Sequence, residues 1–316
     1  MPGPLSHIRV LDLSRIMAGP WCGQILADLG ADVIKVERLG AGDDTRRWGP
    51  PFLKDSAGNT TKEAGYYLSV NRGKRSVELD LKTEEGRDAV RALARESDIL
   101  LENFKTGTLG RMGLGYDDLK EVNPRLIYAS VTGFGLTGPQ ANDAAYDFMI
   151  QGMGGLMSVT GGPDTEPGGG PQKVGVPIID IMSGMYTAIG ALAALANRDQ
   201  TGKGDHIDIA MLDVSVAMLA NQAMNYLISG QTPARRGNRH PNIQPQNVYP
   251  VQDGFIVLAV GNDSQFVRFC EVIGQPALSD DPKFATNAAR VENLEELEAL
   301  LIAALADRTI TTWCEA

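Results

Sequence analysis

Short apolar segments alternate with helical segments over the first 210 residues, and this alternation limits the fold more than any other feature of the sequence. A strand, a helix and a further strand in succession produce parallel strand pairing, with helices covering the sheet. The sequence therefore predicts an α/β fold with a doubly wound, Rossmann-like parallel sheet. The expected strands lie at 8–13, 31–36, 76–81, 98–101, 126–131 and 206–211.

The sequence changes character after residue 230, where 231–247 is rich in Arg, Pro, Asn and Gln. Such a stretch is typical of a loop or a domain boundary. The Gly-rich segment 161–170 is expected to be a flexible surface loop or lid. We therefore expect a large Rossmann-like domain over 1–205, a linker over 206–230, and a small α+β domain over 231–316 with a hairpin at 248–260 and helices at 263–273 and 292–306.

A single charged residue, Asp180, interrupts an apolar stretch that covers 174–195. This acid and the many small residues around it favour a buried core helix over a membrane span. Asp180 follows Pro177 by three residues, and because proline favours the first turn of a helix, the acid is expected near a helix N-terminus. There the helix dipole would keep the carboxylate ionised without a salt bridge. Two interpretations stay open from these residues alone: an acid that only complements the dipole, and a nucleophilic carboxylate.

Composition and charge argue against several classes of function. The formal net charge of −10 disfavours nucleic acid as the main partner. Cys22, Cys270 and Cys314 are widely spaced, which is typical of reduced thiols in a cytoplasmic protein, and a catalytic Cys22 has no support. The three histidines have no metal-ligand spacing, so no metal is expected. The N-terminus lacks the basic and apolar regions of a signal peptide, and no membrane association is expected.

The predicted strand-to-helix turns bear on ligand binding. The first turn, at 12–20, lacks the GxGxxG pattern of a dinucleotide site, so a nicotinamide or flavin enzyme is not expected. Basic residues follow several strands, and they indicate either a phosphate-binding pocket or solvated surface charge. They are Arg38, Arg46, Arg47, Arg72, Lys74, Arg75, Lys105 and Arg111. The pair Tyr146-Asp147 is by itself more typical of a helix start than of a site.

Several sequence blocks together resemble the class III CoA-transferases, the family of formyl-CoA transferase and carnitine CoA-transferase. Residues 42–52 and 67–72 are most similar to the branch that uses succinyl-CoA with glutarate or hydroxymethylglutarate as acceptor. The other blocks are Gly30-Ala-Asp-Val-Ile-Lys-Val-Glu-Arg38, Asn71-Arg-Gly-Lys-Arg-Ser76, Glu102-Asn-Phe104, Arg111-Met-Gly113, Asn123-Pro-Arg-Leu-Ile127, and Gly175-Val-Pro-Ile-Ile-Asp180 with Gly184.

The resemblance implies a mechanism and a binding site. Asp180 matches the family's nucleophilic aspartate, which forms an aspartyl–acyl anhydride and then an aspartyl-CoA thioester. Coenzyme A and acyl-CoA are therefore expected as substrates, with a carboxylic or dicarboxylic acid as acceptor and no permanently bound cofactor. Residues 1–205 would be the CoA-binding domain, and a cytoplasmic homodimer of interlocked rings is expected. The residues expected to bind CoA and substrate are Ile16, Met17, Arg38, Asn71, Lys74, Asn103, Phe104, Arg111, Met112, Tyr146 and Asp147.

The sequence also departs from the family pattern. Met17 stands where formyl-CoA transferases have a glutamine, which argues against oxalate or formate as a substrate, and no tetraglycine lid is found. Family members continue past the position of Ala316, so the family's C-terminal return segment is expected to be absent. Two alternative functions stay open, an α-methylacyl-CoA racemase and a non-catalytic acyl-CoA-binding fragment. The racemase branch has a His-Asp pair where this chain has Tyr146-Asp147, which disfavours that alternative.

Overall fold

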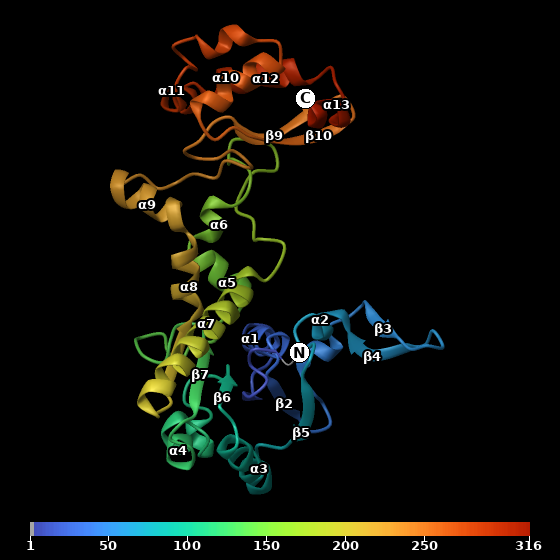
Figure 1. The fold of residues 1–316 in the computed structure, drawn as a ribbon, viewed down its shortest axis with the longest axis vertical. Helices are drawn as coiled ribbons and strands as arrows, with labels where there is room; N and C mark the ends of the chain where they lie inside the picture. The colour runs from blue at the N-terminus through green and yellow to red at the C-terminus, as the bar shows by residue number, and fades with distance from the viewer. Residues whose placement is uncertain (1–2) are drawn as a thin grey trace. The chain divides into compact units, whose positions relative to one another are not determined.

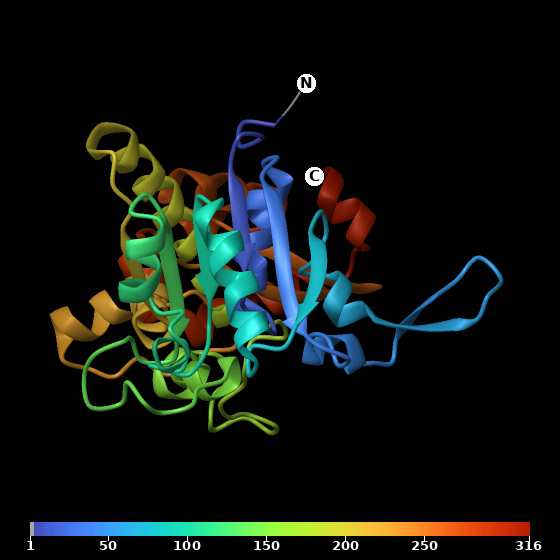
Figure 2. The same cartoon turned by 90° about the horizontal axis from the view of Figure 1, so that it is seen from below.

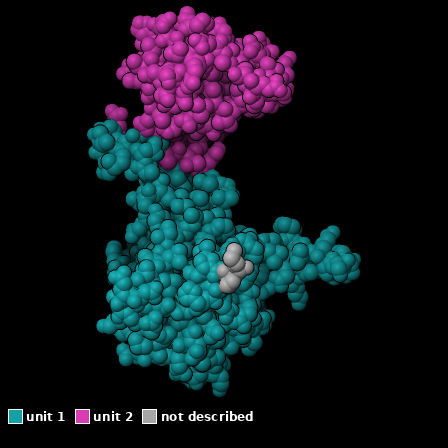
Figure 3. Space-filling view, viewed as in Figure 1, with its two compact units in different colours: residues 1–157, 173–230 teal, residues 158–172, 231–316 magenta. Residues whose placement is uncertain are grey.

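The computed structural model describes residues 3–316 and divides the chain into two compact units (Figure 3). The larger unit comprises Met1–Met157 and Lys173–Gly230, and the smaller unit comprises Ser158–Gln172 and Gln231–Ala316. One boundary lies directly after residue 230, where the sequence changes character. The Gly-rich segment 161–170 belongs to the smaller unit, although in sequence it interrupts the larger one.

Six parallel strands form the sheet of the larger unit (Figures 1 and 2). Their order across the sheet is β5-β2-β1-β6-β7-β8, so the direction of winding reverses between β1 and β6. This is the strand order of doubly wound folds, and it confirms the predicted parallel α/β sheet. The strands are β1 (Arg9–Asp12), β2 (Asp32–Arg38), β5 (Arg75–Leu79), β6 (Ile99–Glu102), β7 (Ile127–Thr132) and β8 (His206–Ala210).

Side chains of the central strands alternate between two apolar cores, because successive residues of a strand point to opposite faces. In β1, Val10 packs in one core with residues of α1 and α7, whereas Leu11 packs in the other with residues of α3 and α4. Helices therefore cover both faces, which explains why these strands are continuous apolar runs. The helices are α1 (Ala18–Asp28), α3 (Glu84–Arg95), α4 (Tyr116–Val122) and α7 (Ile178–Thr201).

Helix α7 is the apolar helix that contains Asp180. Within residues 3–316, it alone has the length and apolar composition that could cross a membrane. However, Ala188 and Ala191 are buried in the core between the sheet, α1 and α7. Gly184 allows α1 to approach closely, since a Cβ atom at this position would lie 2.5 Å from the carbonyl oxygen of Ala18. One face of α7 therefore packs in the core, as the sequence predicted, whereas Met185, Tyr186 and Ile189 of the same helix are exposed.

The expected linker over 206–230 is instead an integral part of the larger unit. Residues 206–210 form β8, which pairs with β7, and α8 (Met211–Met218) and α9 (Ala220–Ser229) follow it. Met211 and Val214 of α8 are buried, so this segment contributes to the core rather than connecting two domains. The composition changes only after residue 230, and the larger unit ends at that point.

Some short elements had no sequence prediction. A hairpin of β3 (Phe52–Lys54) and β4 (Thr60–Ala64), followed by α2 (Gly65–Leu68), lies between β2 and β5 in the sequence (Figure 1). Its strands are mostly exposed and polar, so no apolar alternation marks them. Helix α6 (Leu156–Val159) was also missed, and only the start of α5 (Asp147–Met153) was indicated, because each helix is too short for a helical period to be recognised.

The smaller unit contains the predicted hairpin and helices. Strands β9 (Gln246–Val251) and β10 (Gly254–Ala259) pair in antiparallel register, and Tyr249 lies in a core with Phe266 and Leu297. The helices around this core are α10 (Asp263–Val272), α11 (Asn287–Glu292), α12 (Leu294–Leu305) and α13 (Ile310–Glu315).

Ion pairs hold the Gly-rich segment within the smaller unit. Arg235 pairs with Asp164 of this segment, and Arg239 pairs with Glu166 at 3.1 Å and with Glu298 at 2.7 Å. Arg235 and Arg239 therefore already have carboxylate partners from this chain, and the segment is anchored at two acids rather than being a free lid.

Candidate active site

A cavity of about 610 Å³ lies at the carboxyl ends of β1, β6 and β7, next to the point where the strand order reverses. Ligands of doubly wound proteins bind at this position, because the connections on its two sides run in opposite directions and leave a crevice. The cavity brings together six of the site residues predicted from the sequence. They are Ile16, Asn103, Phe104, Tyr146, Asp147 and Asp180.

The turn after β1 forms one wall of this cavity and is conformationally strained. Ile16 has φ of 69°, a left-handed conformation that is unfavourable for a β-branched residue. The turn is held by a reciprocal pair of hydrogen bonds, in which the Arg15 N–H donates to Asn103 Oδ1 at 2.8 Å and Asn103 Nδ2 donates to the Arg15 carbonyl at 2.7 Å. Strain that the surrounding contacts maintain is typical of functional sites. Asn103 therefore positions the wall of the cavity.

Asp180 lies in the first turn of α7 and lines the cavity. Burial, and then the charge of Asp147, raise the pKa of Asp180 to about 7. Among the described residues, no lysine, arginine or histidine forms an ion pair with it. The position at the helix N-terminus is as predicted, and burial together with Asp147 makes this acid harder to ionise than an ordinary aspartate.

Asp147, in the first turn of α5, caps the N-terminus of α7. Its Oδ2 accepts from the N–H of Ile179 at 2.7 Å and from the N–H of Asp180 at 3.1 Å, two of the donors that a helix start leaves unpaired. Its Oδ1 accepts from Gln151 Nε2 at 2.5 Å. Tyr146, by contrast, is 72% exposed. The Tyr146-Asp147 pair is thus both a helix start, as the residues alone suggested, and part of the cavity wall.

Two aromatic residues near Asp180 had no sequence prediction. Trp48 lines the cavity, and its ring meets the ring of Tyr66 edge to face at 5.0 Å between centroids. Burial, and then the charges of Asp180 and Asp147, raise the pKa of Tyr66 to about 12. The Tyr66 phenol therefore keeps its proton at neutral pH and is a hydrogen-bond donor. Trp48 lies in the block 42–52 noted above, but neither residue was assigned to the site, since their proximity to Asp180 depends on the path of residues 44–68.

A second cavity of about 310 Å³ adjoins the first, and the two share Arg15 and Phe104 in their walls. The second cavity contains two further predicted residues, Arg38 and Met112. Arg15 lies with its guanidinium 4.9 Å from the centroid of the Phe104 ring, a cation–π contact. The exposed Arg111, which the sequence also indicated, lines neither cavity and donates to Thr108 Oγ1 at 3.1 Å.

Three predicted residues, Met17, Asn71 and Lys74, are buried beneath the site and line neither cavity. Lys74 Nζ lies 2.8 Å from Asp12 Oδ2, 2.8 Å from the Pro20 carbonyl and 3.0 Å from Asn71 Oδ1. The three N–H bonds of the ammonium are thus matched by three acceptors. A contact of Lys74 with a CoA phosphate stays a prediction, and it would require these bonds to be exchanged.

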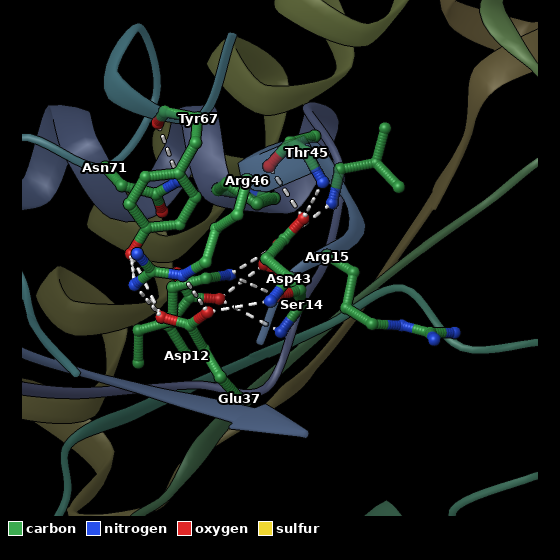
Figure 4. A network of polar contacts seen from close by, with 12 residues as sticks. Asp12, Ser14, Arg15, Glu37, Asp43, Thr45, Arg46, Tyr67 and Asn71 are labelled. Atoms are coloured by element: carbon green, nitrogen blue, oxygen red, sulfur yellow. Dashed lines mark hydrogen bonds and ion pairs between the residues drawn. The ribbon is translucent and has the colours of Figure 1, made fainter. Parts of the chain in front are cut away.

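A larger polar network lies under the first strand-to-helix turn, and Figure 4 shows Asp12, Asp43 and Glu37 in it. Lys74 belongs to this network through its ion pair with Asp12. A second buried pair joins Lys35 to Asp43 at 3.0 Å, and Lys35 Nζ also donates to the Ser14 carbonyl at 2.8 Å. Glu37 pairs with Arg46 at 2.7 Å. Because each of these acids has a basic partner, the network serves to hold the turn rather than to react.

Other reactive groups in the described part of the chain are less suited to chemistry. Cys22 is fully buried, and burial raises the pKa of its thiol far above the usual range, so it is not a nucleophile. Residues 3–316 contain no group of three or more His, Cys, Asp or Glu side chains that could hold a metal ion. Asp180, by contrast, combines access to the cavity of about 610 Å³ with a charge that has no basic partner among the described residues.

Known proteins resemble this chain over nearly its whole length. A family model described as CoA-transferase family III matches residues 5–316. The chain is 54% identical over 298 residues to a succinate–glutarate CoA-transferase of Agrobacterium fabrum, covering 94% of this chain and 73% of that protein. It is 43% identical over 310 residues to a succinyl-CoA:glutarate CoA-transferase of Mus musculus, with coverage of 98% and 69%. The solved structure of a CaiB/BaiF family protein from Brucella suis matches with a TM-score of 0.86 and 51% identity, covering 100% of this chain and 81% of that chain.

Proposed function

The chain belongs to CoA-transferase family III and is an enzyme of that family, and we propose that Asp180 is the nucleophile through which it transfers CoA from succinyl-CoA to a dicarboxylate. The observation that carries this proposal is the environment of Asp180. The carboxylate faces a cavity, has no basic partner among the described residues, and has a pKa of about 7. Such a group is ionised in part at neutral pH, and its charge is poorly solvated, so it is reactive.

The transfer proceeds by acyl exchange at Asp180. A carboxylate oxygen of Asp180 attacks the thioester carbonyl carbon of succinyl-CoA, the C–S bond breaks, and CoA leaves as the thiolate. The thiolate then attacks the Asp180 carbonyl carbon of this mixed anhydride, which releases succinate and leaves an aspartyl-CoA thioester. The acceptor carboxylate attacks the aspartyl carbonyl carbon of that thioester, the C–S bond breaks, and a second mixed anhydride forms as the CoA thiolate leaves. The thiolate then attacks the acceptor's acyl carbon, which releases the new acyl-CoA and the Asp180 carboxylate. No step requires a metal or a permanently bound cofactor.

The two adjoining cavities support an extended position for CoA. Arg38 in the second cavity would bind phosphate by charge-assisted hydrogen bonds, while Phe104 and Met112 would pack against the adenine or pantetheine. The thioester would then reach Asp180 past Arg15 and Phe104, which line both cavities. The names of the similar enzymes support succinyl-CoA as donor and glutarate as acceptor.

Oxygen labelling tests this route. With glutarate that carries ¹⁸O in its reacting carboxylate, one labelled oxygen is expected to pass to Asp180 and, in the next cycle, to succinate. Direct attack of glutarate on succinyl-CoA would leave no label in the protein. A racemase would show neither transfer nor labelling, but would instead exchange deuterium into the α-position of an acyl-CoA. CoA binding without acyl exchange would indicate the non-catalytic alternative.

We also propose that the protein is a cytoplasmic homodimer with interlocked chains. Large apolar side chains on α7 and α9, Ile189, Leu227 and Ile228, are 60%, 70% and 80% exposed, which is a surface suited to a partner. The three cysteines are free thiols, which is typical of a reducing compartment. Light scattering after size-exclusion chromatography tests the dimer, and a monomer at micromolar concentration would contradict it.

A further inference from the structure

Gln151 is a buried amide on α5 that the acyl-exchange steps above do not use. Its exposed fraction is 0%, and it lies one helical turn after Asp147. Its Nε2 donates to Asp147 Oδ1 at 2.5 Å, and its Oε1 accepts from the N–H of Val174 at 2.9 Å. Reversing the amide would place its oxygen against the carboxylate and its NH₂ group against an N–H, so these partners fix its orientation.

The same carboxylate connects Gln151 to the first turn of α7. While Oδ1 of Asp147 accepts from Gln151, Oδ2 accepts from the N–H of Ile179 at 2.7 Å and of Asp180 at 3.1 Å. Donors on both oxygens remove the rotational freedom of the Asp147 side chain. Gln151 therefore fixes the orientation of a carboxylate that is bonded to the backbone of the nucleophile.

Val174 extends this connection to a third segment. It is the second residue of the larger unit after the chain leaves Ser158–Gln172, and Gln151 holds its backbone at a point six residues before Asp180. The hydrogen bonds of one amide thus join the segment that enters α7, through Val174, and the first turn of α7, through Asp147. Both ends of the segment between Val174 and Ile179 are fixed from α5.

We propose that Gln151 is a positioning residue for CoA transfer, which holds Asp147 against the first turn of α7 and thereby fixes the place of the Asp180 carboxylate in the cavity. The proposal rests on the proposed function of Asp180. Nucleophilic attack requires the carboxylate oxygen close to the thioester carbon and in line with it, and a misplacement of about 1 Å can cost on the order of 100-fold in rate. Gln151 lines neither cavity, so it acts on the reaction only through these contacts.

The substitution Gln151→Met keeps the length of the side chain and removes its hydrogen bonds. We expect kcat, and the rate at which succinyl-CoA modifies Asp180, to fall about 10- to 100-fold. The KM for succinyl-CoA should stay within about twofold, because the CoA-binding surfaces are unchanged. The control is Gln200→Met, at the exposed far end of α7, with wild-type kinetics expected. A wild-type kcat for Gln151→Met, or a raised KM with unchanged kcat, would overturn the proposal.

A double-mutant cycle distinguishes positioning through Asp147 from general damage to the fold. In an Asp147→Asn background, Gln151→Met should lower kcat by less than about threefold further, since the contact is already altered. Independent, additive losses would overturn the proposal. If Gln151→Met does not fold, Gln151→Asn serves instead, because it keeps an amide in the interior but is one methylene too short to bond both Asp147 and Val174. The same loss of kcat is expected, and wild-type kcat would contradict the proposal.

Modification of the wild-type protein by succinyl-CoA tests the proposed nucleophile Asp180 separately from the proposed role of Gln151. If succinyl-CoA does not modify Asp180 in the wild type, the proposed nucleophile is wrong. If the wild type is modified and Gln151→Met is modified at the same rate, the nucleophile stands and only the positioning role of Gln151 is wrong.

Discussion

Two groups of buried acids in the larger unit differ in whether a basic side chain compensates their charge. Under the first strand-to-helix turn, Asp12 and Asp43 are paired with Lys74 and Lys35 at 2.8 Å and 3.0 Å. Burial alone would raise the pKa of Asp12, but the two lysines hold it below its usual value. At the N-terminus of α7, Asp180 has no cation beside it, and burial, followed by the like charge of Asp147, raises its pKa to about 7.

The contrast shows how one domain separates stability from reactivity. A buried acid with a lysine partner and hydrogen bonds is stable and unreactive, because its charge is compensated. A buried acid beside another acid has a destabilised anion, and nucleophilic attack relieves that charge. Asp147 differs from Asp180 in this respect, since three N–H donors occupy its oxygens. Of the two neighbouring acids, Asp180 is therefore the one that is free to react.

The largest expected effect comes from neutralising the uncompensated acid. Asp180→Asn should lower kcat by on the order of 10⁴-fold or more, because the nucleophile is lost, while CoA binding should persist. Steady-state transfer from succinyl-CoA to glutarate, together with CoA binding by calorimetry, measures both. Asp199→Asn on the same helix is exposed and is the matched control. Substantial turnover by Asp180→Asn would show that the uncompensated acid is no more essential to the reaction than the lysine-paired acids.

The compensated group should respond in stability instead. Lys35→Met leaves Asp43 buried without its cation, and both side chains of this pair are 1% exposed. The free energy of unfolding should fall by about 3–5 kcal/mol, measured by urea denaturation near neutral pH. Lys203→Met, at an exposed lysine, should leave stability almost unchanged. If Lys35→Met is as stable as the wild type, the pair does not hold the turn.

A smaller expected effect is on the stability of the protein, through the charge of Asp180. Because the folded protein raises the pKa of Asp180 to about 7, the protonated acid contributes stability that is fully present below about pH 4 and is lost as the pH rises through about 7. Asp180→Asn should therefore be more stable than the wild type at pH 8, by on the order of 2 kcal/mol, and the difference should shrink toward pH 5. Thermal denaturation at several pH values measures this. A constant difference would show that Asp180 is not destabilised by its charge.

The fold could be predicted because its signals are local. The apolar strands of the sheet and the hairpin at 248–260 are each visible within a few residues, and both occur in the structure. Helices α8 and α9 were missed because residues 206–230 were assigned to a linker. The change in composition that marks the domain boundary lies after these helices, not before them. The exposed hairpin of β3 and β4 has no apolar pattern to recognise.

The site was predictable only in part, because its electrostatics depend on distant contacts. Asp180 is conspicuous as a lone charge in an apolar run, and the cavity does contain it. Lys74 resembles a phosphate ligand in sequence, yet its partner Asp12 lies 62 residues away and occupies its charge. The bond from the Asp180 N–H to Asp147 spans 33 residues, and no spacing rule connects the two helices. The burial of these side chains and the identity of their partners could therefore be learned only from the structure.

Trapping the covalent intermediate tests the central claim most directly. The wild-type protein is incubated with succinyl-CoA without acceptor, digested under acid conditions and analysed by mass spectrometry, with a parallel sample treated with hydroxylamine. We predict an acyl or CoA adduct on the peptide that contains Asp180, which hydroxylamine removes. A protein that transfers CoA at full rate without any adduct on Asp180, or with the adduct on a different residue, would contradict the account.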